Sequence, residues 1–178
     1  NIRNLIKEKG LVEFQKAVVT SFMGPRTTVT DFKIDSLDLY ESNLFIKYNF
    51  DEKGENESIL YVNPYFGQGL GDNPFKSAER VYPVEMPYSM DQTYTMQIEI
   101  PDGYTVDELP NTITLKLNDK GEGKFEYKIS QSGSTISLRS RLVFTRSLFN
   151  PNEYQALRQL FDMVGKKQAE QIVFKKKK

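Results

Sequence analysis

A succession of short β-favouring segments, separated by polar turns, is the feature that most constrains how this chain of 178 residues can fold. Beyond residue 26, runs of β-branched and aromatic residues end repeatedly at Asp, Asn, Gly or Pro, which is typical of strands joined by turns. Several runs alternate between apolar and polar side chains, so each strand would have one apolar and one polar face. The expected strands are residues 27–34, 44–50, 59–62, 79–84, 94–100, 112–117, 123–130, 135–144 and 171–174.

Apolar residues at helical spacing predict helices near both ends of the chain. In residues 2–22 the pattern is interrupted at Gly10 and ends before Pro25, which indicates one helix or two short ones. Pro151 begins a second amphipathic pattern that extends to residue 165, and this pattern predicts a C-terminal helix.

These elements together predict a mainly β fold. The number of short strands favours an antiparallel two-layer β-sandwich, immunoglobulin-like or jelly-roll-like, with an N-terminal helix and one C-terminal helix. We expect residues 1–26 to be a helical connector and residues 27–178 to form the β-sandwich domain, with its helix at residues 151–165.

Residues 63–76 form a long stretch without a regular pattern, because prolines and glycines interrupt it. Long ordered loops are uncommon unless they cap, bind or link something, so this loop is the first candidate for a functional site. Its aromatic side chains, and those beside it, could stack on a glycan or peptide, dock on another domain, or anchor the loop to the sandwich; we favour anchoring. The candidate interaction residues are Tyr61, Tyr65, Phe66, Phe75, Arg80, Tyr82 and Tyr88.

Histidine and cysteine are both absent from the sequence. Imidazole titrates near neutral pH and thiolate is a strong nucleophile, so two common centres of hydrolytic and transfer chemistry are missing. Transition-metal binding is disfavoured for the same reason. The glycine-rich residues 67–71 are not followed by the Lys-Ser or Lys-Thr of a phosphate loop, and no pair of carboxylates stands out as acid and base. We expect no catalytic, cofactor or metal site.

Charge and hydropathy exclude two further classes of partner. The 24 basic and 24 acidic residues balance, so no net field favours nucleic acid. The basic run at residues 175–178 is typical of a solvated terminus. No apolar run approaches the roughly 20 residues needed to cross a bilayer, so we expect no membrane span. The first residues resemble neither a signal peptide nor a natural start, and we expect the chain to be a piece of a longer protein.

Two segments of the chain together resemble the sequence pattern of a known family. Residues 73–84 read Asn-Pro-Phe-Lys-Ser-Ala-Glu-Arg-Val-Tyr-Pro-Val, and residues 101–110 begin with Pro-Asp-Gly-Tyr and end with Leu-Pro. With Tyr154 and the closing residues 171–173, this pattern resembles the C-terminal accessory β-domain, a domain of unknown function, of bacterial transglutaminase-like proteins. The resemblance covers about residues 27–175, and residues 2–22 resemble the piece that connects such a domain to its core.

The resemblance implies a non-catalytic accessory role. The chemistry of that family depends on a Cys, a His and an Asp in an upstream papain-like core, so no catalytic residue carries over to this chain. The implied partner is the transglutaminase-like core of the same polypeptide, in a parent protein exported to the periplasm or cell surface. Within the matched segment we expect Arg80 to pair with Glu79 or Glu85. The alternative function is a glycan- or peptide-binding β-sandwich module that uses the aromatic residues of 61–88.

Overall fold

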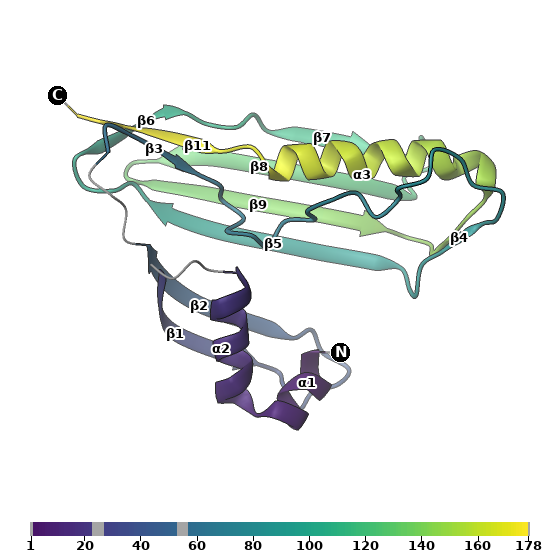
Figure 1. Ribbon diagram of the computed structural model, residues 1–178, viewed down its shortest axis with the longest axis horizontal. Coiled ribbons are helices and arrows are strands. Elements are labelled where there is room, and N and C mark those ends of the chain that lie inside the picture. Colours follow the sequence, from purple (N-terminus) through teal and green to yellow (C-terminus); the bar gives the residue numbers. More distant parts are fainter. Residues whose placement is uncertain (1, 23–26, 53–56, 178) are drawn as a thin grey trace. The chain divides into compact units, whose positions relative to one another are not determined.

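The computed structural model describes residues 2–22, 27–52 and 57–177. The chain divides into two compact units, Asn1–Asn56 and Glu57–Lys178 (Figure 1). The expected domain boundary lies at residue 26, whereas the units divide after residue 56, so the first two strands belong with the N-terminal helices.

The first unit is a pair of helices and a pair of strands. Gly10 separates the two helices with a φ of 82°, which explains the interruption in the helical pattern. Ile6 and Phe14 are buried, and Phe32 of the hairpin packs against them. The elements are α1 (Ile2–Lys9), α2 (Leu11–Phe22), β1 (Thr27–Asp35) and β2 (Phe45–Glu52), and the two strands pair antiparallel.

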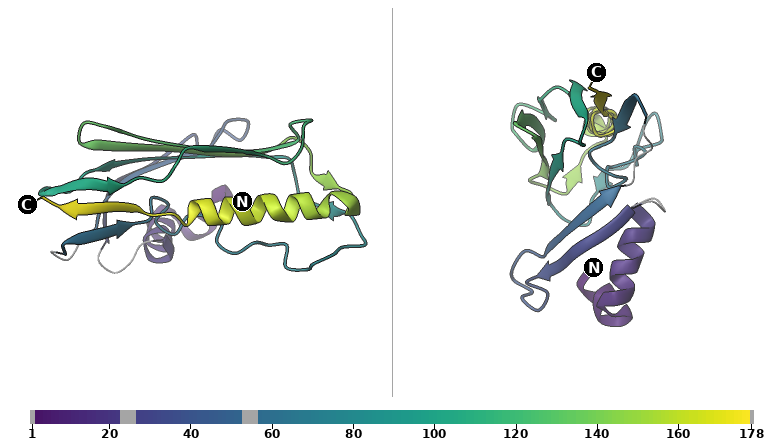
Figure 2. Two further views of the ribbon diagram at one scale, coloured as in Figure 1. Left: turned by 90° about the horizontal axis from the view of Figure 1, so that it is seen from above. Right: turned by 90° about the vertical axis from the view of Figure 1, so that its left-hand side faces the viewer.

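The second unit has two layers. One layer is a four-stranded antiparallel sheet in the order β5-β9-β8-β7. In the other layer, helix α3 and the three-stranded sheet β3-β11-β6 lie end to end along the long sheet (Figures 1 and 2). The strands are β3 (Ile59–Val62), β4 (Val84–Glu85), β5 (Met90–Glu99), β6 (Tyr104–Glu108), β7 (Ile113–Lys116), β8 (Gly123–Ser132), β9 (Thr135–Phe144), β10 (Leu148–Phe149) and β11 (Ile172–Lys176); the helices are η1 (Pro151–Glu153) and α3 (Tyr154–Gln168).

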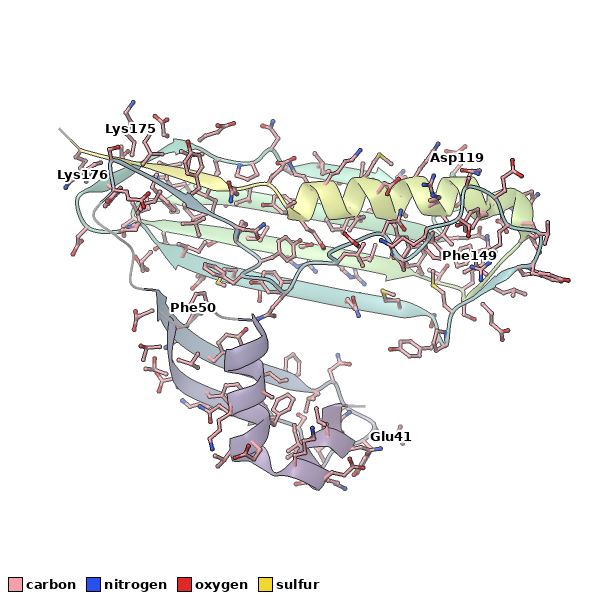
Figure 3. The ribbon with its side chains drawn as sticks, viewed as in Figure 1. Glu41, Phe50, Asp119, Phe149, Lys175 and Lys176 are labelled. Atoms are coloured by element: carbon pink, nitrogen blue, oxygen red, sulfur yellow. The ribbon has the colours of Figure 1, made fainter. Side chains whose placement is uncertain are left out.

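The hydrophobic core lies between these two layers. Alternate residues of β8 and β9 point inward, where they meet one face of α3 and the inner side of β11. Phe149 of β10 lies near the amino-terminal end of α3 and stacks edge-on against Phe144 with ring centroids 5.8 Å apart (Figure 3). The fully buried large side chains include Phe125, Tyr127, Ile136, Phe144, Phe149, Tyr154, Leu157, Leu160, Val164, Ile172 and Phe174.

The prediction of a mainly β, antiparallel fold with helices towards both ends is confirmed, and residues 59–62 and 135–144 form strands with the expected bounds. The expected strand at 79–84 is wrong: only Val84–Glu85 forms a strand, and it pairs with β10. Strand β6 is not among the expected strands. Helix α3 passes through Gly165 and ends three residues later.

Candidate functional site

Residues 63–78, which we call the strap, run along helix α3. At the carboxyl end of the helix, the Asn63 side chain donates a hydrogen bond to the Gln168 carbonyl at 3.0 Å. The Leu70 backbone N–H donates to Oε1 of Gln168 at 2.6 Å. A Cβ atom at Gly165 would lie 3.2 Å from the Gly71 carbonyl oxygen, so the strap approaches the helix closely at this glycine. These contacts fix one end of the strap.

The middle of the strap is held by one asparagine. The Asn73 amide donates to the Arg158 carbonyl at 2.9 Å and to Oδ1 of Asp162 at 2.7 Å. Its own Oδ1 accepts the Phe75 N–H at 2.8 Å, and the Phe75 carbonyl accepts a hydrogen bond from Arg158 Nε at 3.1 Å. The asparagine thus ties a turn in the strap to two positions one helical turn apart.

The last part of the strap is fixed at the amino end of α3. The Tyr154 hydroxyl donates to the Ser77 carbonyl at 2.8 Å. The Gln155 side chain donates to the next carbonyl, that of Ala78. The strap contains no helix or strand, yet side-chain hydrogen bonds with α3 hold it at both ends and in the middle. These bonds give partners to backbone groups of the strap that would be paired with a neighbouring strand if the segment lay in a sheet.

Two of the seven candidate residues are anchors of the strap. The Tyr65 side chain is only 2% exposed, and its ring stacks on that of Tyr94 with centroids 4.8 Å apart. Burial raises the pKa of the Tyr65 hydroxyl. The Phe75 ring meets Phe161 edge-on, with centroids 4.9 Å apart. Phe66 is half-buried beside them, with a φ of 46°. The Tyr65 ring therefore offers no face to a ligand in solvent.

The other candidate residues are exposed but do not form one site. Arg80, Tyr82 and Tyr88 lie in or beside the irregular segment that follows the strap, whereas Tyr61 lies on β3, opposite Val173 of β11. Arg80 makes no ion pair with any residue that the structure describes, so the expected pairing with Glu79 or Glu85 is not found.

Residues 79–88, which we call the exposed segment, present apolar side chains on a fixed backbone. Val81, Tyr82 and Tyr88 are 80%, 76% and 68% exposed. Leu148, also exposed, lies on β10 directly opposite Glu85. The β4–β10 pairing and a 2.8 Å hydrogen bond from the Met86 N–H to the Ser147 carbonyl hold the segment. Sequence reasoning missed Val81 and Leu148, which look like ordinary core residues until their burial is known.

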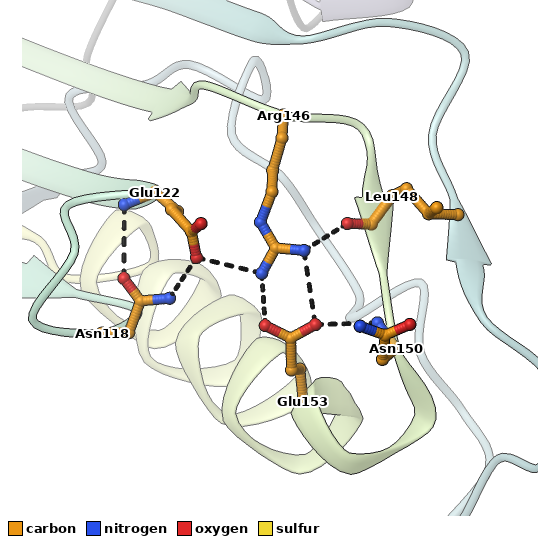
Figure 4. A network of polar contacts seen from close by, with 6 residues as sticks. All are labelled: Asn118, Glu122, Arg146, Leu148, Asn150 and Glu153. Carbon is orange, nitrogen blue, oxygen red and sulfur yellow. Dashed lines mark hydrogen bonds and ion pairs between the residues drawn. The ribbon is translucent and has the colours of Figure 1, made fainter.

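Arg146, in the link between β9 and β10, is the centre of a polar network that sequence reasoning also missed (Figure 4). Its guanidinium donates to Oε2 of Glu122 at 3.0 Å and to both carboxylate oxygens of Glu153. The Asn118 amide donates to the same oxygen of Glu122 at 2.8 Å, and the Asn150 N–H donates to Glu153 at 2.8 Å. The network joins the β7–β8 turn to the start of the helical region.

The charged groups of this network stabilise one another's ionised forms. Hydrogen bonds to Glu153 and Glu122 raise the pKa of Arg146. Its guanidinium, followed by the Asn150 N–H, holds the pKa of the Glu153 carboxyl below its usual value. Arg146 also lies over the ring of Phe149, with its central guanidinium carbon 4.3 Å from the centroid. One guanidinium thus bridges two carboxylates, an arrangement that holds the β7–β8 turn to the start of the helical region.

The described residues contain no group of three or more carboxylate, imidazole or thiol side chains placed to hold a metal ion. Within the same residues, no helix combines the length and apolar character that a membrane crossing requires.

Comparison with known proteins gives a family match and one distant structural similarity. The family described as "Domain of Unknown Function with solved-structure structure (DUF3858)" matches residues 58–174, which are nearly all of the second unit. A crystal structure described as a "putative protease" from Parabacteroides distasonis ATCC 8503 is 19% identical, with a TM-score of 0.48, over 56% of this chain. The chain spans only 19% of that protein's length. No curated protein matches the chain.

Proposed function

Because this chain belongs to the DUF3858 family, we propose that its second unit is a non-catalytic accessory domain that docks on a transglutaminase-like core of the same polypeptide. The resemblance of residues 73–84 and 101–110 to the accessory domains of such proteins supports the partner. The absence of His and Cys from the chain supports a non-catalytic role. The same resemblance supports a parent protein in the periplasm or at the cell surface.

The observation that carries this proposal is the exposed segment. Aromatic and aliphatic side chains that project from a fixed backbone are typical of protein interfaces, where they enter pockets at little cost in conformational entropy. Val81 and Tyr82 meet this description because hydrogen bonds hold the backbone before and after them.

The test is to measure the affinity of residues 1–178 for the upstream segment of the same gene, expressed separately. We expect Tyr82→Ala with Val81→Ser to weaken binding about tenfold or more, because hot-spot truncations cost about 2 kcal/mol or more. Tyr61→Ala is the matched control: this tyrosine is also exposed, but it lies on β3, and its removal should leave the affinity unchanged.

Two results would contradict the proposal. One is an upstream gene segment that encodes no papain-like core. The other is an affinity that Tyr61→Ala lowers as much as the exposed-segment variant does. If residues 1–178 instead bound neutral glycans, and Tyr82→Ala or Tyr88→Ala abolished that binding, the glycan-binding alternative would replace docking.

A further inference from the structure

The outer face of the four-stranded sheet is turned away from α3 (Figure 2). The side chains that the strands place on this face are mostly polar. Because side chains alternate along each strand, the residues between the buried positions of β8 and β9 all lie on this face. A shallow depression of about 490 Å³ lies on it. The residues around the depression are Thr95, Met96, Gln97, Thr112, Lys128, Ile129, Ser130, Ser137, Leu138 and Arg139.

Two like charges face each other at the centre of this depression. In the register of the sheet Lys128 of β8 lies directly opposite Arg139 of β9, and Thr95 of β5 lies on the other side of Arg139. Like charges directly opposite on one face of a sheet destabilise the pair. The next row towards the hairpin end pairs Ser130 with Ser137, whose short side chains leave space beside the two cations.

Two other cations on this face have close carboxylate partners, whereas Lys116 of β7, which lies opposite Lys124, has no ion pair with any residue that the structure describes. Arg141 makes a bidentate contact with Asp91, at 2.8 and 2.6 Å, and Lys124 lies 3.0 Å from Glu126. Arg139, by contrast, has no hydrogen bond or ion pair with any residue that the structure describes. Lys128 has only a distant partner, since its Nζ is 3.9 Å from Glu126. Arg139 and Lys128 are therefore less closely paired than Arg141 and Lys124, although both attract Glu126 electrostatically.

The chemistry around these cations favours an acidic sugar over a neutral sugar or an extended peptide. None of the residues that line the depression is acidic or aromatic, and the hydroxyl and amide groups of Thr95, Gln97, Ser130 and Ser137 lie beside the two charges. Glu126 lies in the next row of the sheet, outside the depression. Strands β8 and β9 are the inner strands of the sheet, so their backbone groups pair with neighbouring strands and cannot receive an extended peptide. Without an aromatic ring, a neutral sugar has nothing to stack on, whereas a carboxylate has two cations to bind.

We propose that this depression binds the carboxylate of a uronic-acid sugar, with Arg139 and Lys128 contacting the carboxylate and the surrounding hydroxyl and amide groups contacting the sugar hydroxyls. The site is separate from the exposed segment and does not depend on docking to a core. It also differs from the aromatic glycan site considered for residues 61–88, because recognition here is by charge and hydrogen bonds.

Calorimetric titration of residues 1–178 with trigalacturonate, and with its methyl ester, tests the proposal. The acid should bind with an affinity that falls as salt increases, and the ester should bind at least about tenfold more weakly, because it lacks the charges. Arg139→Gln and Lys128→Gln should each weaken binding of the acid by about tenfold or more. Lys124→Gln is the matched control, because it removes a cation of the same face that already has a partner.

Thermal unfolding separates loss of binding from loss of structure. Because each central variant removes one of two opposed like charges, both should unfold at the temperature of the parent or above it. The proposal is overturned if trigalacturonate does not bind, if its ester binds equally well, or if Lys124→Gln has the same effect as Arg139→Gln. Equal affinity for a poly-glutamate peptide would also overturn it, because the hydroxyl and amide groups would then have no role in selection.

Discussion

The strap and the exposed segment are adjacent in sequence, are both almost without regular structure, and yet differ in what their aromatic side chains do. In the strap, residues 63–78, Tyr65 and Phe75 turn inward and the backbone is tied to α3. In the exposed segment, residues 79–88, Tyr82 and Tyr88 project into solvent. Irregular backbone is therefore not by itself a sign of function, because the strap packs into the core whereas the exposed segment presents its aromatic side chains to solvent.

The largest difference in stability is expected between variants of two tyrosines, Tyr65 in the strap and Tyr82 in the exposed segment. Tyr65→Ala should lower the free energy of unfolding by about 3–5 kcal/mol, because it leaves a cavity where a buried ring stacks on Tyr94. Tyr82→Ala should change it by less than about 0.5 kcal/mol, because that side chain is mostly in solvent. Chemical denaturation of both variants measures the two values. Equal losses would remove the distinction between strap and exposed segment.

A smaller difference in the free energy of unfolding is expected between variants of Arg146 and Arg80. Arg146→Ala should lower the free energy of unfolding by about 2–3 kcal/mol, because Glu153 and Glu122 would lose their half-buried partner. Arg80→Ala, in the exposed segment, should be neutral to within about 0.5 kcal/mol, since Arg80 is exposed and without an ion pair among the described residues. Thermal denaturation of the two variants under the same conditions compares their stabilities. An Arg80→Ala chain that is the less stable of the two would contradict this assignment.

The sequence predicts those elements whose pattern lies within a few consecutive residues. The alternation of β9 and the helical spacing of α3 are properties of consecutive residues, and the strap could be identified from its prolines and glycines. The strand expected at residues 79–84 failed for a physical reason: β propensity does not provide a pairing partner, and Pro83 has no N–H to donate to a ladder. Strand β6 was missed because Thr105, Asp107 and Glu108 make it polar, and its stability comes from pairing with the distant β11.

The candidate sites were harder to predict because they depend on contacts between distant residues. Arg146 looks like any surface arginine until the fold brings it to Glu122 and Glu153. The opposition of Lys128 and Arg139 depends on the register of β8 against β9, and one residue of slip would place one of the two charges on the other face. Sequence alone could not separate the buried aromatic residues of 61–88 from the exposed ones, because their burial depends on contacts with α3 and β5.

Amide hydrogen exchange of residues 1–178, alone and with the upstream segment of the same gene, tests most directly the claim that the strap is structural and the exposed segment binds the core. We expect the amides of residues 79–88 to exchange more slowly in the presence of the partner, and those of residues 63–78, a segment already held by hydrogen bonds to α3, to change little. Unchanged exchange in residues 79–88, with new protection in the strap, would contradict it.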